Sequence, residues 1–311
     1  MQLLVYSQVW RSCSSRLFVR IFPGSSDPGT LIAGRRQIHE GVVALSYDLY
    51  DGSAPGSPLV LLHGLFGSKS NFQSIASALV RNTGRKVLTL DARNHGSSPH
   101  TNIMTYHAMS ADVQHILEKL HIPKCILIGH SMGGKTAMTL ALQQPQLVER
   151  LVSVDISPSQ SIPQSIPQSG FPKFITAMQN VRLEGNMPRS TARRLADEQL
   201  STIVKKPAVR NFLITNLVQE NGNFKWRVNL EAISSHLHDL MDFPEFHEPY
   251  PGPTLFLGGA DSPYISSENY NEIERLFPYA NVEYIIGSGH WVHADKTEDF
   301  LNAICNFVQT T

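Results

Sequence analysis

The chain has 311 residues, and its 26 lysines and arginines are balanced by 26 aspartates and glutamates. This length can hold one α/β domain with insertions, and the neutral balance gives no electrostatic case for binding nucleic acid. No apolar run approaches the roughly 20 residues that a transmembrane helix needs, three scattered cysteines predict neither a disulfide framework nor a metal site, and we expect no cofactor.

The first 36 residues differ in composition from the rest of the chain. Arg11, Arg16 and Arg20 lie among serines and apolar residues, and no acidic residue occurs before Asp27. Such a start is typical of a mitochondrial transit peptide, and the alternative is a disordered tail without an address. We therefore expect residues 1–36 to be a leader and the protein to be mitochondrial, in the matrix, where cysteines stay reduced.

Short apolar runs and helical patterns then alternate along the chain. An opening strand or hairpin is expected over 42–50, followed by strands over 58–62, 87–90, 124–128 and 151–154. Helical spacing covers the intervening segments 70–81, 108–120 and 135–144. This alternation predicts an α/β fold, with a mainly parallel sheet, helices on both faces, and ligands bound beyond the carboxyl ends of the strands.

The alternation is interrupted between about residues 157 and 247, and we expect a helical cap there, inserted into a single α/β domain over 37–311. Helical patterns cover 171–184, 189–204, 206–220 and 229–241, and no strand is expected before Thr254. Most apolar residues of the cap should form its own core, and a minority should line a substrate pocket. The α/β pattern resumes with strands over 254–257 and 282–286 and helices over 268–277 and 297–308.

The segment Ile126–Gly134 combines a strand, a Gly-x-Ser-x-Gly turn around Ser131 and the start of a helix. This is the context of a nucleophile elbow, in which a sharp turn exposes the serine hydroxyl. The helix N-terminus behind the serine favours developing negative charge. The alternative is a glycine-rich turn with an incidental serine, and the strand and helix flanks argue against it.

A serine hydroxyl needs a base, an acid that orients the base, and donors for the oxyanion. His290 is the candidate base because it follows the last expected strand in a Gly-Ser-Gly-His segment. The candidate oxyanion donors are two backbone N–H groups, that of Met132 next to the serine and that of Leu65 after the first long strand.

Three carboxylates are candidates for the acid. Asp261 follows the first strand after the cap, Asp155 ends the strand after the nucleophile helix, and Glu231 lies at the start of the last cap helix. Asp261 could instead be a turn aspartate, and Glu231 a charge that stabilises a helix N-terminus. The residues alone do not rank the three.

From about residue 40 to the C-terminus, the chain resembles the α/β-hydrolase superfamily. The segments LLHGLFGSKSNF, LTLDARNHGSSPH, IGHSMGGKTAM, ERLVSVDISP, WRVNLEAI and GHWVHADK are similar to those of the α/β-hydrolase domain-containing protein 11 family. The resemblance implies a mitochondrial serine ester hydrolase of acyl lipids, with diacylglycerol as the substrate class. It also implies a link to the 2-oxoglutarate dehydrogenase complex and its lipoyl groups.

The same resemblance places the nucleophile at Ser131, the base at His290 and the acid at Glu231, whereas bacterial relatives suggest Asp155. Two functions therefore stay open. The first is hydrolysis of carboxylic esters, for which the apolar cap suggests an acyl-chain substrate. The second is a protein that binds and maintains the 2-oxoglutarate dehydrogenase complex, motivated by the resemblance and by the proline-rich stretch 161–169. The serine, histidine and oxyanion segments favour hydrolysis.

Overall fold

The computed structural model describes residues 41–159, 170–183, 185 and 187–309. All of them belong to one compact unit, Ile38–Thr311. The predicted leader 1–36 and the proline-rich stretch 161–169 lie outside the described residues. None of the helices described is long and apolar enough to cross a bilayer.

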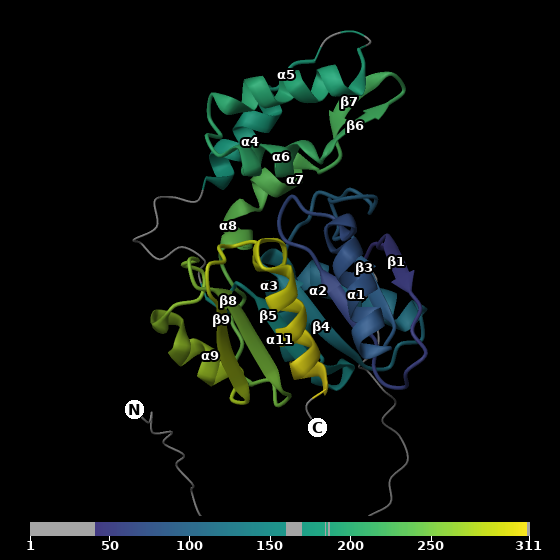
Figure 1. Cartoon of the computed structure of the whole chain (residues 1–311), viewed down its shortest axis with the longest axis vertical. Helices are drawn as coiled ribbons and strands as arrows, with labels where there is room; N and C mark the ends of the chain where they lie inside the picture. The colour runs from purple at the N-terminus through teal and green to yellow at the C-terminus, as the bar shows by residue number, and fades with distance from the viewer. Residues whose placement is uncertain (1–40, 160–169, 184, 186, 310–311) are drawn as a thin grey trace, which may run out of the picture. The chain divides into compact units, whose positions relative to one another are not determined.

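A seven-stranded sheet runs through this unit in the order β1-β3-β2-β4-β5-β8-β9 (Figure 1). Its strands are β1 Tyr47–Tyr50, β2 Leu59–Leu62, β3 Val87–Leu90, β4 Cys125–His130, β5 Val148–Val154, β8 Thr254–Gly259 and β9 Ala280–Ile285. Strand β1, at one edge, is antiparallel to β3, and the other neighbours are parallel. The expected α/β fold with a mainly parallel sheet is therefore confirmed.

Helices cover both faces of the sheet. They are η1 Lys69–Phe72, α1 Gln73–Thr83, α2 Tyr106–Lys119, α3 Met132–Gln143, η2 Pro145–Leu147, η3 Ser267–Asn269, α9 Tyr270–Leu276, α10 Val292–Asp295 and α11 Thr297–Gln309. In β2, Leu59 and Leu61 point into the core shared with α1 and α11, whereas Val60 and Leu62 point into the core shared with α2 and α3. Burial on both faces explains the continuous apolar runs of the inner strands.

Between β5 and β8 the chain forms a cap (Figure 1). Its buried apolar residues pack in one cluster with residues of the body, namely Leu65, Phe66, Met104, Tyr106, Met109 and Met132. Its elements are α4 Phe171–Asn180, α5 Arg189–Ser201, α6 Pro207–Ile214, β6 Leu217–Glu220, β7 Asn223–Trp226, α7 Leu230–Ser235 and α8 Leu237–Met241. Helices α7 and α8 lie between the outer part of the cap and the sheet (Figure 1). The last part of the cap thus returns the chain to the sheet.

The expected all-helical character of the cap is wrong in one place. The helix predicted over 206–220 ends at Ile214, and the antiparallel hairpin of β6 and β7 follows it. The hairpin turn is Asn221-Gly222, and both residues have positive φ, 51° and 81°. Asn-Gly between two short strands is a strong sequence signal for a two-residue hairpin, and the helical interpretation of this segment overlooked it.

Candidate active site

Ser131 lies between β4 and α3 in a backbone conformation (φ 53°, ψ −117°) that residues other than glycine rarely adopt. Two close approaches shape this turn. A Cβ atom on Gly133 would lie 2.3 Å from the Leu62 carbonyl oxygen, and one on Gly129 would lie 2.2 Å from the Gly133 carbonyl oxygen. Because only glycine fits at either position, α3 can begin directly against β2 and present the serine at the tip of the turn.

Three strand ends bring Ser131, His290 and Asp155 into one hydrogen-bonded chain. The Ser131 Oγ lies 3.1 Å from His290 Nε2, and His290 Nδ1 lies 2.7 Å from Asp155 Oδ2. The three residues follow β4, β9 and β5, and parallel strands end at the same edge of a sheet. In this arrangement a histidine can take the serine proton while a carboxylate orients its ring.

The Asp155 carboxylate is fully buried and accepts two further hydrogen bonds. The Gly259 N–H donates to Oδ1 at 2.9 Å, and the Ser262 hydroxyl donates to Oδ2, the oxygen that also faces His290. Burial of a carboxylate is costly unless its oxygens are hydrogen-bonded. These donors satisfy the charge and fix the direction in which it meets the imidazole.

The other two candidate acids lie elsewhere. Glu231 is exposed in the first turn of α7, within the cap, and Asp261 is exposed in the turn after β8. Within the described residues, the carboxylate hydrogen-bonded to His290 is that of Asp155. The family resemblance places the acid at Glu231, and the structure instead places Asp155 against the histidine.

Leu65 and Met132, whose N–H groups are the expected oxyanion donors, both lie beside the serine. Met132 is the first residue of α3, where an N–H has no acceptor within its own helix. Leu65 lines the same cavity as Ser131, and a Cβ atom on Gly64 would lie 3.3 Å from the Ser131 Cβ, so this turn packs closely against the serine. Neither N–H donates to a backbone carbonyl in the described part of the chain.

Two buried histidines hold the turn that carries Leu65. His63 accepts the Ala92 N–H at Nε2 (3.1 Å) and donates from Nδ1 to the Gly64 carbonyl (2.8 Å). His95 accepts the Phe66 N–H at Nε2 (3.1 Å) and donates from Nδ1 to the Arg93 carbonyl (3.0 Å). Burial lowers the pKa of His63 to about 4 and that of His95 to about 3, which keeps both rings neutral and able to accept.

His130 and His293 pack around the base. The ring of His130 lies 4.8 Å from the ring of His290, and its Nε2 lies 2.8 Å from the His290 carbonyl oxygen. His293 packs on His130 at 4.8 Å and on Phe72 at 5.0 Å, as expected for a structural residue. Burial lowers the pKa of His130 well below its usual range and that of His293 to about 4, so neutral rings surround the base.

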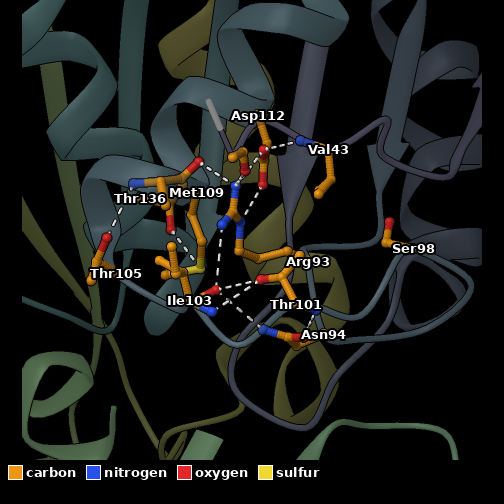
Figure 2. A network of polar contacts seen from close by, with 12 residues as sticks. Val43, Arg93, Asn94, Ser98, Thr101, Ile103, Thr105, Met109, Asp112 and Thr136 are labelled. Carbon is orange, nitrogen blue, oxygen red and sulfur yellow. Dashed lines mark hydrogen bonds and ion pairs between the residues drawn. The ribbon is translucent and has the colours of Figure 1, made fainter. Parts of the chain in front are cut away.

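A buried ion pair anchors the loop that follows β3 (Figure 2). Arg93 Nε and Nη2 donate to the two carboxylate oxygens of Asp112 at 2.6 and 2.7 Å, and both side chains are almost fully buried. Asp112 also accepts the Val43 N–H at 2.8 Å, and a further guanidinium N–H donates to the Ile103 carbonyl at 3.3 Å. Burial raises the pKa of Asp112, and its hydrogen bonds with Arg93 oppose this rise.

An apolar cavity of about 650 Å³ opens from Ser131 and His290. Both the body and the cap contribute to its walls, with the apolar residues Leu65, Phe66, Phe72, Ile75, Phe171, Phe174, Val209, Phe212, Leu213 and Trp291. Phe66 packs on Phe171 with ring centres 6.2 Å apart, and Phe212 packs on Trp291 at 5.7 Å. Such a cavity suits an apolar chain attached to a group that reacts at the serine.

A family model described as the α/β hydrolase fold matches residues 57–297. The chain is 78% identical to a Xenopus tropicalis protein named sn-1-specific diacylglycerol lipase ABHD11 over 269 residues, 86% of this chain and 83% of that protein. It is 72% identical to the Xenopus laevis protein of the same name over 296 residues, 94% of each. The solved structure of a marine microorganism esterase has a TM-score of 0.79 and 32% sequence identity, covering 85% of this chain and 99% of that one.

The chain belongs to the α/β-hydrolase family, in the branch of the ABHD11 proteins. This family and the esterase and lipase names of its relatives support a serine ester hydrolase. The structure brings together Ser131 and His290, the nucleophile and base that the sequence predicts, and it places the predicted oxyanion turn at Leu65 in the same cavity. The sequence does not predict Ser262 as a partner of the buried carboxylate or Arg93 as the anchor of the loop after β3, since neither residue lies in a pattern that specifies a contact.

Proposed function

We propose that this α/β hydrolase cleaves acyl esters of glycerolipids, with diacylglycerol as its substrate, through an acyl-enzyme on Ser131. The observation that carries the proposal is the hydrogen-bonded chain Ser131–His290–Asp155 at the floor of an apolar cavity. The names of the Xenopus relatives support the substrate class.

In the first half of the proposed reaction, His290 Nε2 takes the Ser131 proton as the serine oxygen attacks the ester carbonyl carbon. Asp155 holds the imidazole through Nδ1 and stabilises the imidazolium that forms. The N–H groups of Leu65 and Met132 donate to the oxyanion, and each such donor contributes about 3 kcal/mol at the transition state. The intermediate then breaks its bond to the glycerol oxygen, which leaves with the proton from His290.

In the second half, a water molecule replaces the monoacylglycerol product. His290 removes a proton from this water as it attacks the acyl-enzyme, and the same two N–H groups stabilise the second oxyanion. Ser131 leaves with the proton, and a fatty acid is released. The apolar walls from Phe171, Phe174 and Phe212 hold the acyl chain throughout, which keeps the ester carbonyl in place for both steps.

A fluorophosphonate probe tests the nucleophile directly. We expect the folded protein to be labelled at Ser131, and the Ser131→Ala protein to be unlabelled and at least about a thousandfold slower on a short-chain ester. Thermal melting of both proteins checks that the fold is kept. Labelling of another residue, or full turnover by Ser131→Ala, would contradict the proposal. Turnover on diacylglycerol then tests the substrate.

We also propose that residues 1–36 direct the protein to the mitochondrial matrix. The composition of this segment supports the proposal, with three arginines and no acidic residue before Asp27. A fluorescent protein fused behind residues 1–36 should collect in mitochondria and resist protease added to intact organelles. The same fusion with Arg11, Arg16 and Arg20 replaced by glutamate should stay outside.

We propose binding to the 2-oxoglutarate dehydrogenase complex as a second function, supported by the sequence resemblance to a family with that link. The Ser131→Ala variant distinguishes the two functions. If binding suffices, Ser131→Ala should restore the lipoylation of the complex in cells that lack the protein. If hydrolysis is required, the variant should not restore it, and binding would be secondary to catalysis.

A further inference from the structure

Charge is distributed unevenly over this electrically neutral chain. The outer cap, defined here as residues 170–228 (α4 to β7), has ten lysines and arginines against four aspartates and glutamates. The rest of the domain carries the opposite excess, including the acidic residues of α7 and α8. The outer cap is therefore a positively charged region on a molecule without net charge.

Few of the charges on the outer cap are neutralised locally. Ion pairs join Arg210 to Asp197, Arg194 to Glu198 and Lys225 to Glu220. No carboxylate of the described residues lies within ion-pair distance of the other basic side chains of the outer cap, Lys173, Arg182, Arg189, Arg193, Lys205, Lys206 and Arg227. Their field acts on whatever approaches the outer cap.

Two segments at the rim of the cavity combine such lysines with exposed apolar groups. On α4, the exposed residues Pro172 and Lys173 lie between Phe171 and Phe174, which line the cavity. Before α6, the exposed Ile203, Lys205, Lys206 and Pro207 precede Val209, which lines it as well. Ile203 is one of the exposed large apolar side chains, with 41% of its surface accessible. The rim is therefore both basic and locally apolar.

We propose that the outer cap docks on an anionic lipid surface through these two rim segments. The inference rests on the proposed function, because a diacylglycerol substrate resides in a bilayer and must pass from it into the cavity. Lysines near such a surface bind its negative charge, and exposed apolar side chains enter the boundary between head groups and acyl chains. Docking at the rim places the mouth of the cavity against the lipid from which the substrate comes.

An acidic protein would offer the same charge complementarity. The lipid surface is favoured because Lys206 itself lines the apolar cavity and Lys173 lies next to Phe174, which lines it too. Exposed Ile203 and Pro207 moreover flank the two lysines of the second segment in the chain. Any acidic partner would explain the exposed lysines. A partner with an apolar interior also explains why these lysines lie next to exposed apolar side chains beside the cavity.

Vesicle cosedimentation tests the proposal with the full chain carrying Ser131→Ala, so that no substrate is consumed. We expect binding to phosphatidylcholine vesicles that contain phosphatidylglycerol, and little binding to phosphatidylcholine alone. Adding Lys173→Glu and Lys206→Glu should weaken binding by about twentyfold or more, since each lysine near an anionic surface contributes close to a fivefold gain. Both positions lie in the first turn or at the N-cap of a helix, where glutamate is tolerated.

The matched control carries Lys119→Glu and Lys124→Glu, two exposed positions at the end of α2 and just before β4. Lys124 precedes β4 and Ser131 follows it, so these lysines lie at the other end of the strands from the serine. Replacing both with glutamate changes the net charge by the same amount as the Lys173→Glu and Lys206→Glu pair. The arginines of residues 1–36 are present in both proteins. Equal weakening by the two double variants, or binding to a soluble acidic polypeptide but not to vesicles, would overturn the proposal.

Ile203→Ser tests the apolar part of the same contact. We expect it to weaken vesicle binding at high salt, where screening removes the lysine contribution, and an unchanged affinity would mean that the apolar group does not enter the lipid. Turnover of a water-soluble short ester by the chain with its serine intact is measured separately. If the Ser131→Ala chain does not bind the anionic vesicles while the chain with its serine intact turns over the short ester, docking alone is rejected. If the chain with its serine intact does not turn over the short ester, the proposed function is rejected.

Discussion

The loops around Ser131 and the cap above them are held in different ways. The side chains of His63, His95 and Arg93 hold the loops and are at most 2% exposed, and each bonds backbone groups of a neighbouring segment. In the cap, the hydrogen bonds of the described residues between 170 and 214 all stay within the cap itself. Hydrogen bonds between the cap and the body come from Asn216, from Arg227 and from the returning part of the cap, residues 229–242.

This difference separates the chemistry from the binding of the substrate. Buried, directional hydrogen bonds fix the groups that must meet a reacting carbonyl within a few tenths of an ångström. Helices α4 and α6 contact the body through rings, Phe171 on Phe66 and Phe212 on Trp291, and such contacts are less directional. Directional hydrogen bonds therefore position the catalytic groups, whereas α4 and α6 meet the body through apolar contacts.

The largest expected effect is at the acid of the rigid region. In Asp155→Asn, the amide cannot stabilise the imidazolium and favours the wrong tautomer of His290, so kcat should fall by about ten-thousandfold. Turnover of a short-chain ester measures the loss, and circular dichroism checks the fold. The fold decrease in kcat should be similar for a short ester and for diacylglycerol.

Glu231→Gln and Asp261→Asn are the matched controls, because each removes one of the other candidate carboxylates from an exposed position. Both should keep kcat within about threefold of the unaltered enzyme, as is usual for surface substitutions. A loss in Glu231→Gln as large as that in Asp155→Asn would show that the cap supplies the acid and would remove the proposed separation between the two regions.

The next effect concerns stability. Arg93→Met leaves Asp112 buried without its cation, and breaking such a pair costs about 3–5 kcal/mol of unfolding free energy. Urea denaturation measures it. Arg194→Ala removes an exposed pair of the cap, with side chains 62% and 56% accessible, and should change stability by about 0.5 kcal/mol or less. Restoring much of the loss with a second change, Asp112→Leu, would show that the unpaired charge causes it.

The same contrast explains what the sequence could predict. Strands β2 and β4 were visible because burial on both faces requires continuous apolar runs, and Ser131 because its motif connects a strand to a helix. His290 followed from its position after the last strand. Each of these inferences depends on a local pattern whose physical cause lies within about ten residues of chain.

The acid could not be chosen this way. Asp155 and Asp261 both follow strands that end at the same edge of the sheet, and a sequence does not state which side chain turns towards His290. Asp155 does so from a backbone with φ 51°, a conformation that favours glycine, and its position depends on donors from Gly259 and Ser262 about a hundred residues later. Contacts over such separations are set by packing, which no local pattern encodes.

A smaller effect is expected at His95, which positions the oxyanion turn without contacting the substrate. His95→Ala removes the acceptor of the Phe66 N–H, so kcat should fall by about tenfold to a hundredfold with KM nearly unchanged. In His95→Gln, the amide oxygen can accept the same N–H, and most of the rate should return. Loss of stability without the change in kcat would mean that the residue is structural only.

The protonation of His95 provides a second measurement. Its pKa is lowered to about 3 in the folded protein from an ordinary value of 6.5, so the unfolded chain binds more protons between these values. The free energy of unfolding should therefore fall as the pH drops from about 6.5 towards 3. His95→Gln should lose part of this acid sensitivity, and an identical pH profile would contradict the lowered pKa.

The smallest effect is expected where the returning part of the cap meets the rigid region. Asn229 Nδ2 donates to Asn94 Oδ1 (3.1 Å) and to the Thr101 carbonyl (3.2 Å), while its Oδ1 accepts the Ala232 N–H at the start of α7. Asn229→Ser keeps a helix cap and removes the two donors, which should cost about 1 kcal/mol of stability.

The informative readout for Asn229→Ser is a difference between substrates. If the returning part fixes the cap, KM for diacylglycerol should rise several-fold, while kcat for a short ester, which barely reaches the cap, stays the same. Hydrogen exchange should quicken in α7 and not in α3. Asn223→Ser, at an exposed position of the hairpin, is the control and should alter neither. Equal losses on both substrates would mean that Asn229 supports the loop after β3, and that the cap and the catalytic loops form one mechanical unit.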